Sequence, residues 1–168
     1  MADPLPSTGE NNGTRASGPG GAAAAALRLC RGVTRMLYEM GQASLPEMTL
    51  ANGRRADLVA LDAKGQVTIV EIKSCINDFR TDAKWPEYEP FCDEFYFAVS
   101  NEFPIDVLPA HTGLIIADGF GGAIVRRARL NALPAARRKA VTLRFARLAA
   151  TRHAAPLLSA MDGGGFVP

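Results

Sequence analysis

The sequence predicts an α/β fold in which helices flank one mixed central β-sheet. Three observations predict this class: an amphipathic helical repeat near the start, several short segments rich in β-branched residues, and a basic helical pattern near the end. The chain has 168 residues, 48% of them hydrophobic and 21% charged, so it can bury the core of a single domain. No stretch has the roughly 20 consecutive apolar residues of a membrane span, and the start does not resemble a signal peptide. We therefore expect a cytoplasmic protein without a membrane partner.

The elements follow in the order that these patterns give. Residues 1–22, rich in Pro, Gly, Ser and Ala, are typical of a disordered tail. The domain is expected over residues 23–154 and a flexible tail over residues 155–168. Within the domain, the expected helices lie at residues 22–40, 76–84 and 134–153, and the expected strands at residues 45–50, 55–61, 67–73, 94–100, 111–118 and 123–127.

Two of these strands form a hairpin that carries the most informative residues. Its turn ends in Gly65, which can take the left-handed conformation that a bulge needs. Pairing outward from this turn sets Asp57 opposite Glu71. Because side chains alternate along a strand, Asp57, Glu71 and Lys73 then share one face, at the end of an otherwise apolar run.

This arrangement of charges predicts a cation site. Two facing carboxylates repel each other, and burial makes their charge costly unless a cation neutralises it. Lys73 supplies one positive charge, and a divalent metal would supply the rest. Oxygen ligands without a nearby His or Cys favour Mg²⁺, with Mn²⁺ as the alternative, over zinc. The competing interpretation is a surface ion pair at Glu71, and the apolar VTIV run beside it counts against that.

The same residues carry a resemblance to known proteins. Asp57, followed after thirteen intervening residues by Glu71-Ile72-Lys73, resembles the signature of the PD-(D/E)XK nuclease superfamily, although Ala56 stands in place of its proline. A wider resemblance, over residues 45–127, is to the MmcB-like family of bacterial DNA-repair endonucleases. It is carried by LPEMTLANGRRADLVAL, VEIKSCINDFRTDAKWPEYEPFCDEFYFAV and GLIIADGFGGAIVRRA. The resemblance implies a PD-(D/E)XK restriction-endonuclease-like core and a metal-dependent DNA endonuclease that acts in DNA repair by hydrolysing phosphodiester bonds.

The resemblance also implies roles for the residues of the hairpin. Asp57, Glu71 and Lys73 would be catalytic. Asp57, Glu71 and the backbone carbonyl of Ile72 would bind Mg²⁺, which would polarise the scissile phosphate and lower the pKa of a water molecule. Lys73 would orient that water and offset the developing charge. One metal ion and two metal ions are both compatible with the sequence.

A further carboxylate often completes a site of this kind. Glu39 is the only acidic residue of the first helix, and Glu47 lies on the first strand. Either of them is a candidate metal ligand, and the sequence does not choose between them.

Charge is distributed unevenly along the chain, whose formal net charge is +2. Residues 27–118 hold 9 basic and 14 acidic side chains, whereas residues 119–161 hold 9 basic side chains and no acidic one. A basic segment next to an acidic centre suits an enzyme that holds a cation and binds a polyanion. The basic residues of this segment that are expected to hold the DNA backbone are Arg126, Arg127, Arg129, Arg137, Arg138, Arg144 and Arg147.

The segment that directly follows the hairpin mixes charged and aromatic residues. We expect Arg80 and Lys84 to bind DNA, because they follow the candidate site in the chain. Phe79 and Asp82 are expected to have structural roles, with Phe79 in the core.

Two other functional classes fit the same sequence. One is a catalytically lapsed DNA-binding module that recruits repair partners through its basic helix; the intact trio at the hairpin argues against it. The other is a structural or partner-binding protein in which the basic segment serves solubility. The sequence gives neither the oligomeric state, nor protein partners, nor the preferred DNA structure.

Overall fold

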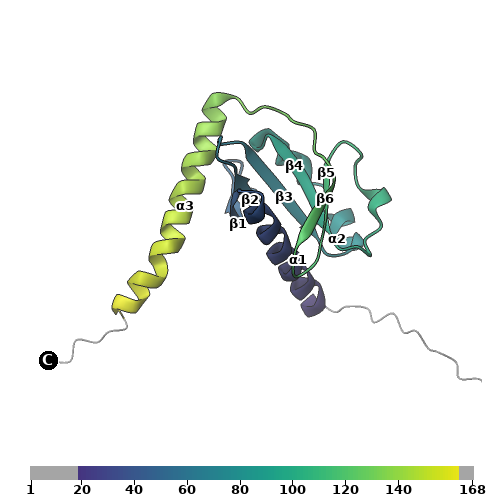
Figure 1. Cartoon of the computed structure of the whole chain (residues 1–168), viewed down its shortest axis with the longest axis horizontal. Helices are drawn as coiled ribbons and strands as arrows, with labels where there is room; N and C mark the ends of the chain where they lie inside the picture. Colours follow the sequence, from purple (N-terminus) through teal and green to yellow (C-terminus); the bar gives the residue numbers. More distant parts are fainter. Residues whose placement is uncertain (1–18, 163–168) are drawn as a thin grey trace, which may run out of the picture.

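A computed structural model describes the backbone of residues 19–162 and the side chains of residues 20–160. Six strands form one sheet in the order β1-β2-β3-β4-β5-β6, with helices packed on it (Figure 1). This confirms the predicted α/β class with a mixed sheet. The elements are α1 (Pro19–Glu39), β1 (Ala43–Thr49), β2 (Arg55–Leu61), β3 (Val67–Lys73), α2 (Ile76–Thr81), the 3₁₀ turns η1 (Trp85–Glu87) and η2 (Glu89–Phe91), β4 (Glu94–Val99), η3 (Ile105–Val107), β5 (Gly113–Ala117), β6 (Gly122–Arg126) and α3 (Ala135–Asp162).

The sheet is antiparallel at both edges and parallel in the middle. β1, β2 and β3 form an antiparallel meander, β3, β4 and β5 run parallel, and β6 returns antiparallel to β5. Each parallel pair needs a crossover, which α2, η1 and η2 provide between β3 and β4. The β2–β3 hairpin has the predicted register, with Leu61 opposite Val67, and Gly65 takes the left-handed conformation at φ 75°.

α1 covers one face of the sheet. Its buried residues recur at helical spacing and pack on the even-numbered residues of β2, β3 and β4. Gly32 lets the β5–β6 turn rest directly on the helix, since a Cβ at this position would lie 2.1 Å from the carbonyl oxygen of Asp118. The residues of this layer on α1 are Leu29, Val33, Met36 and Leu37.

The other face carries α2, the 3₁₀ turns and α3 over the odd-numbered residues of the central strands. Phe79 of α2 meets Phe97 edge to face at 5.5 Å between ring centroids, so its predicted core position is confirmed. Trp85 stacks on Phe95 at 5.7 Å. Phe145 from α3 is also buried in this layer. Glu71 and Lys73, being odd-numbered residues of β3, therefore belong to the α2 side of the sheet.

Several boundaries differ from the prediction. α1 begins at Pro19, so residues 19–22 are helical where the sequence predicts a disordered tail; alanine favours helix, and proline is tolerated in a first turn. α3 continues to Asp162, so residues 155–162 are helical where a flexible tail is predicted, since alanine and leucine flank Pro156. α2 ends at Thr81. Residues 1–18 and 163–168 of the predicted tails lie outside the described residues. No helix of the described part combines the length and apolar character of a membrane span.

A buried ion pair fixes α3 to the sheet. Asp93, only 2% exposed, accepts hydrogen bonds from the backbone amides of Val67 at 2.7 Å and Leu133 at 2.9 Å. Arg138 of α3 donates to both of its carboxylate oxygens, at 2.6 and 2.7 Å. Burial acts in the opposite direction, but the hydrogen bonds from Arg138 and the two amides lower the pKa of Asp93.

We predict that Arg138→Ala lowers the free energy of unfolding by about 3 kcal/mol, because it leaves a buried carboxylate without its counter-charge. Urea denaturation at pH 7 measures the loss. The matched control is Lys139→Ala, an exposed residue of the same helical turn, which should change the value by less than about 0.5 kcal/mol. Because the pKa of Asp93 is lower in the folded state, the pair stabilises the protein above pH ~4, and the difference should narrow as the pH falls below that value. Equal losses for the two variants would contradict the prediction.

Candidate active site

The candidate site lies where β2 and β3 part. Their ladder ends at the pair Leu58↔Val70, and one residue further the side chains of Asp57 and Glu71 take over the hydrogen bonding. The amide of Asp57 donates to Oε1 of Glu71 at 3.1 Å, and the amide of Ile72 donates to Oδ2 of Asp57 at 2.8 Å. Each carboxylate is thus fixed by a backbone amide of the neighbouring strand, and each keeps a second oxygen. The structure therefore brings Asp57 and Glu71 together, in the register that the sequence predicts.

Lys73 points its ammonium into the same cluster. Its side chain is 4% exposed, and Nζ lies 3.8 Å from Oε2 of Glu71. A second acid binds it more closely: Nζ donates to Oδ2 of Asp82 at 2.5 Å. Asp82 directly follows α2, whose Phe79 anchors the helix over the sheet. The sequence prediction treats Asp82 as structural and misses this contact, although its spacing of four residues from Asp78 already places two acids on one helical face.

Burial sets the electrostatics of this cluster. Burial first, and then the charge of Asp57, raise the pKa of Glu71 to about 8. Burial also raises the pKa of Asp57, and the charge of nearby Asp78 adds to the effect. Burial acts to lower the pKa of Lys73, but the hydrogen bond to Asp82 and the charge of Glu71 outweigh it and raise that pKa. The cluster therefore holds its amine charged, and it has an excess of acid groups.

The two candidates for a further carboxylate lie in different places. Glu47 stands between the paired residues Pro46 and Met48, whose partners Leu58 and Ala56 flank Asp57, but its carboxylate pairs with Arg55 at 3.3 Å. Glu39 lies on α1, which packs on the opposite face of the sheet; it pairs with Arg35 at 3.0 Å, and its side chain is 64% exposed. The structure therefore does not bring the candidate Glu39 into the cluster.

Among the described residues, no group of three or more His, Cys, Asp or Glu side chains is placed to hold a metal ion. A cation at this site would therefore depend on Asp57 and Glu71, with the remaining ligands coming from the backbone, from water or from a substrate.

Three of the arginines predicted to hold DNA have partners inside the protein. Arg126 donates to two loop carbonyls, at 2.8 and 3.0 Å. Arg137 donates to the carbonyl of Pro90 at 3.0 Å, and Arg138 is bound by Asp93. These hydrogen bonds give the three residues a structural role, and their contact with DNA stays a prediction. The other predicted contacts are exposed side chains: Arg80, Lys84, Arg127, Arg129, Arg144 and Arg147.

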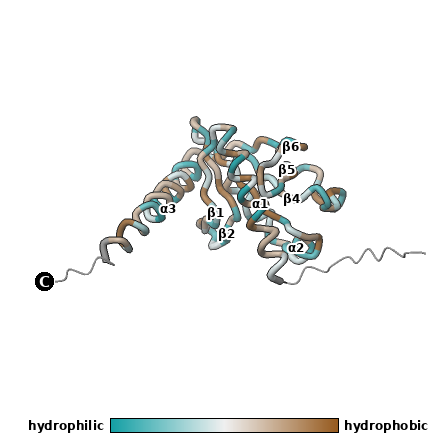
Figure 2. Tube along the Cα trace, turned by 60° about the horizontal axis from the view of Figure 1, so that its bottom comes forward, coloured by the Kyte–Doolittle hydropathy of each residue, from teal (hydrophilic) through white to brown (hydrophobic). Residues whose placement is uncertain are grey.

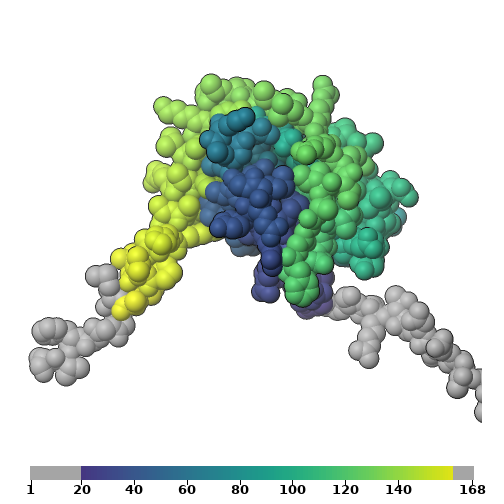
Figure 3. All heavy atoms as spheres, viewed as in Figure 1, coloured from purple at the N-terminus to yellow at the C-terminus, as the bar shows by residue number. Residues whose placement is uncertain are grey.

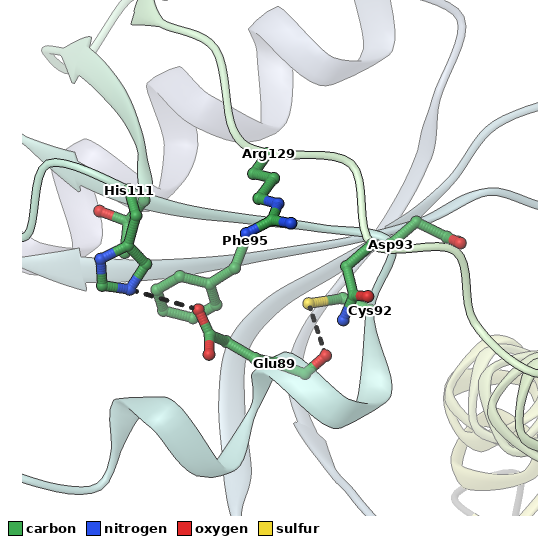
Figure 4. A pocket seen from close by; sticks show the side chains of 8 residues that line it. Glu89, Cys92, Asp93, Phe95, His111 and Arg129 are labelled. Carbon is green, nitrogen blue, oxygen red and sulfur yellow. Dashed lines mark hydrogen bonds and ion pairs between the residues drawn. The ribbon is translucent and has the colours of Figure 1, made fainter.

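A separate pocket of about 320 Å³ lies beside the start of β4, where Figure 4 shows His111 facing Glu89. The two side chains are 3.7 Å apart. Cys92 also lines this pocket, but burial raises the pKa of its thiol far above the ordinary value, so it does not form the thiolate of a nucleophile. Asp93 here is bound by Arg138. Cys92 and Asp93 therefore have structural roles in this pocket.

The fold and the cluster define a class: an α/β protein with a mixed six-stranded sheet and a buried charged site at the end of its central hairpin. A family model described as DNA repair protein MmcB-like matches residues 13–159, and the chain belongs to this family. The SPO1766 protein of unknown function from Silicibacter pomeroyi is similar in structure, with a TM-score of 0.77, 42% identity, and coverage of 85% of this chain and 97% of that chain. A search of curated proteins finds no match. The predicted family is thus confirmed, and its name indicates a role in DNA repair.

We predict that Glu71 makes the stability of the metal-free protein fall as the pH rises. The pKa of Glu71 is about 8 in the folded state and about 4.3 in the unfolded state. Between these values the folded state binds more protons, so the free energy of unfolding decreases with increasing pH. Urea denaturation in EDTA at pH values between these two pKa values should show the decrease in the free energy of unfolding. In Glu71→Gln the free energy of unfolding should depend less on pH. The exposed Glu39→Gln should keep the wild-type slope, and an unchanged slope in Glu71→Gln would contradict the assignment.

Proposed function

We propose that the chain is a metal-dependent DNA endonuclease of the PD-(D/E)XK type that acts in DNA repair. One observation carries the proposal: the buried ammonium of Lys73 lies between Asp82 and Glu71, and a third carboxylate, that of Asp57, lies in the same cluster. A merely structural ion pair needs one acid for one base, and burying further acids beside it costs stability. The membership of a DNA-repair family supports the same function.

The donors of this cluster fit Mg²⁺, with Mn²⁺ as the alternative. Asp57 and Glu71 each accept a hydrogen bond from a backbone amide through one oxygen. Oδ1 of Asp57 and Oε2 of Glu71, the latter 3.8 Å from Nζ of Lys73, are the oxygens that would bind a cation. The backbone carbonyl of Ile72 is proposed as a third ligand. Mg²⁺ is usually bound through one or two carboxylates and keeps several waters, so two acidic ligands are sufficient. A divalent ion would also offset the charge of Asp57, which adds to burial in raising the pKa of Glu71.

Lys73 and Asp82 have different roles in the proposed reaction. A bound Mg²⁺ supplies Lewis-acid polarisation of a phosphate oxygen. The ammonium of Lys73 has three N–H donors, of which Asp82 takes one, so the others are available to a phosphate oxygen or an attacking water. Because its pKa is raised, Lys73 stays charged at neutral pH and stabilises negative charge that develops on the phosphate. Asp82 is a positioning residue, since it acts through Lys73.

We predict that Lys73→Ala reduces cleavage of DNA by at least about 100-fold, because it removes the charge that faces the phosphate. The assay incubates supercoiled, nicked, flapped and single-stranded DNA with Mg²⁺ or Mn²⁺. The control is Lys64→Ala, an exposed lysine in the β2–β3 turn, which should cleave like the wild type. Equal cleavage by wild type and Lys73→Ala would refute the assignment. Salt-sensitive DNA binding without cleavage would instead favour the catalytically lapsed module.

We predict that Mg²⁺ binds to the wild-type protein and that Asp57→Asn weakens this binding by at least about tenfold, because it removes a charged oxygen ligand. Isothermal titration calorimetry without DNA measures the affinity directly. Glu39→Gln changes an acid on the opposite face of the sheet and should bind Mg²⁺ like the wild type. Equal affinity of all three proteins would show that the ion binds elsewhere.

A further inference from the structure

A groove of about 610 Å³ lies between β1 and α3. Figures 1 and 2 show how α3 leans away from the sheet towards its end, and in Figure 3 its last turns stand clear of the rest of the molecule. The groove is lined by Glu47 and Thr49 from the strand and by Leu143, Arg144, Arg147 and Arg152 from the helix.

Contacts near both ends of the groove join its two walls. Near the start of α3, Arg138 binds Asp93 at the opposite end of the sheet from the cluster. Further along, Arg152 donates to the carbonyls of Pro46 and Glu47, the latter at 3.1 Å. Between these anchors the side chain of Phe145 is buried in the core. The helix is therefore tied to the sheet on both sides of the groove.

The helical wall presents positive charge without counter-charge. Arg144 and Arg147 are exposed, and neither forms an ion pair within the described residues. Their spacing of three residues places both on one face of α3. No acid lies between residues 119 and 161 to neutralise them. From Arg144 to Arg152 the helix axis advances about 12 Å, along which one strand of duplex DNA carries three or four phosphates, at about 3.4 Å each.

The groove lies close to the candidate active site along the sheet. Glu47, on its strand wall, stands between Pro46 and Met48, which pair with Leu58 and Ala56 on either side of Asp57. Glu47 itself has the left-handed conformation, with φ 51°, and its carboxylate is neutralised by Arg55 at 3.3 Å. On the other side of the cluster, the segment around α2 exposes Arg80 and Lys84. Positive side chains thus flank the acidic cluster on both sides.

We propose that the groove between β1 and α3 binds the phosphodiester backbone of DNA and leads it to the cluster at Asp57. That the groove guides DNA to a site of cleavage rests on the proposed nuclease function, whereas DNA binding in the groove does not. Arginine contacts of this kind give affinity without sequence specificity and weaken with salt. A lipid surface fits this groove less well, because Leu143, which is 53% exposed, is the one large exposed apolar side chain in its lining among the described residues.

The test measures binding of a fluorescein-labelled duplex of about 20 base pairs by fluorescence anisotropy in EDTA, where no metal supports cleavage. The double variant Arg144→Gln/Arg147→Gln should weaken binding about tenfold near 100 mM salt. It should also reduce the slope of log affinity against log salt concentration by about 1.8, the value for two lost phosphate contacts. The control is Arg28→Gln/Arg31→Gln, two exposed arginines with the same spacing on α1, which should bind within about twofold of the wild type.

The outcomes separate this proposal from the nuclease proposal. Circular dichroism first confirms that both double variants fold. The proposal would be overturned if the α3 variant kept the wild-type affinity for DNA and the wild-type salt dependence, or if both double variants lost equal affinity. Cosedimentation with vesicles of phosphatidylserine and phosphatidylcholine that depends on Arg144 and Arg147, without an effect on DNA binding, would also overturn it in favour of a lipid surface. If the wild type binds DNA through the groove but never cleaves it, the DNA-binding proposal stands and only the nuclease proposal is contradicted.

Discussion

The carboxylates of Asp57, Glu71 and Asp82 cluster with the single ammonium of Lys73 at a largely buried site, and their interactions determine most of the local structure. Glu71 and Lys73 are 3% and 4% exposed, so each charge there loses its hydration. The protein compensates with fixed dipoles: the amides of Asp57 and Ile72 donate to the carboxylates in place of ladder hydrogen bonds. The carboxylates are therefore held by backbone amides that the separation of β2 and β3 sets free. The cluster has more acidic groups than the single ammonium of Lys73 can neutralise, and a bound cation would balance the charge.

The position of the amine depends in turn on the packing of α2. This helix has only six residues, too few to be stable alone, so its place is set by tertiary contacts. Phe79 anchors it against Phe97, and this brings Asp82, at the end of the helix, within 2.5 Å of Lys73. Aromatic packing in the core thus fixes a charge–charge contact at the edge of the cluster. A loss of packing at Phe79 would loosen Lys73 without changing any charged residue.

The sequence could predict those features that local patterns determine. The bounds of β2 and β3 agree with the structure because a turn glycine and alternating apolar residues specify them, and the facing of Asp57 and Glu71 follows from that register. The contact of Asp82 with Lys73 could not be derived in the same way, because it depends on how α2 docks. The sequence cannot choose between Glu39 and Glu47 either, because the pattern of the first helix does not indicate which face of the sheet that helix covers.

The arginines also show what the sequence cannot predict. A count of basic residues predicts that the C-terminal segment binds a polyanion, but it does not separate arginines that satisfy internal acceptors from those that face solvent. Arg138 compensates buried Asp93, 45 residues away in the chain, and is therefore unavailable to a ligand. That same pair fixes the start of α3, and so it keeps Arg144 and Arg147 beside β1. The ion pair of Arg138 is thus a condition for the proposed groove. Arg138 holds α3 beside β1, and the exposed Arg144 and Arg147 supply the positive charge that would attract DNA.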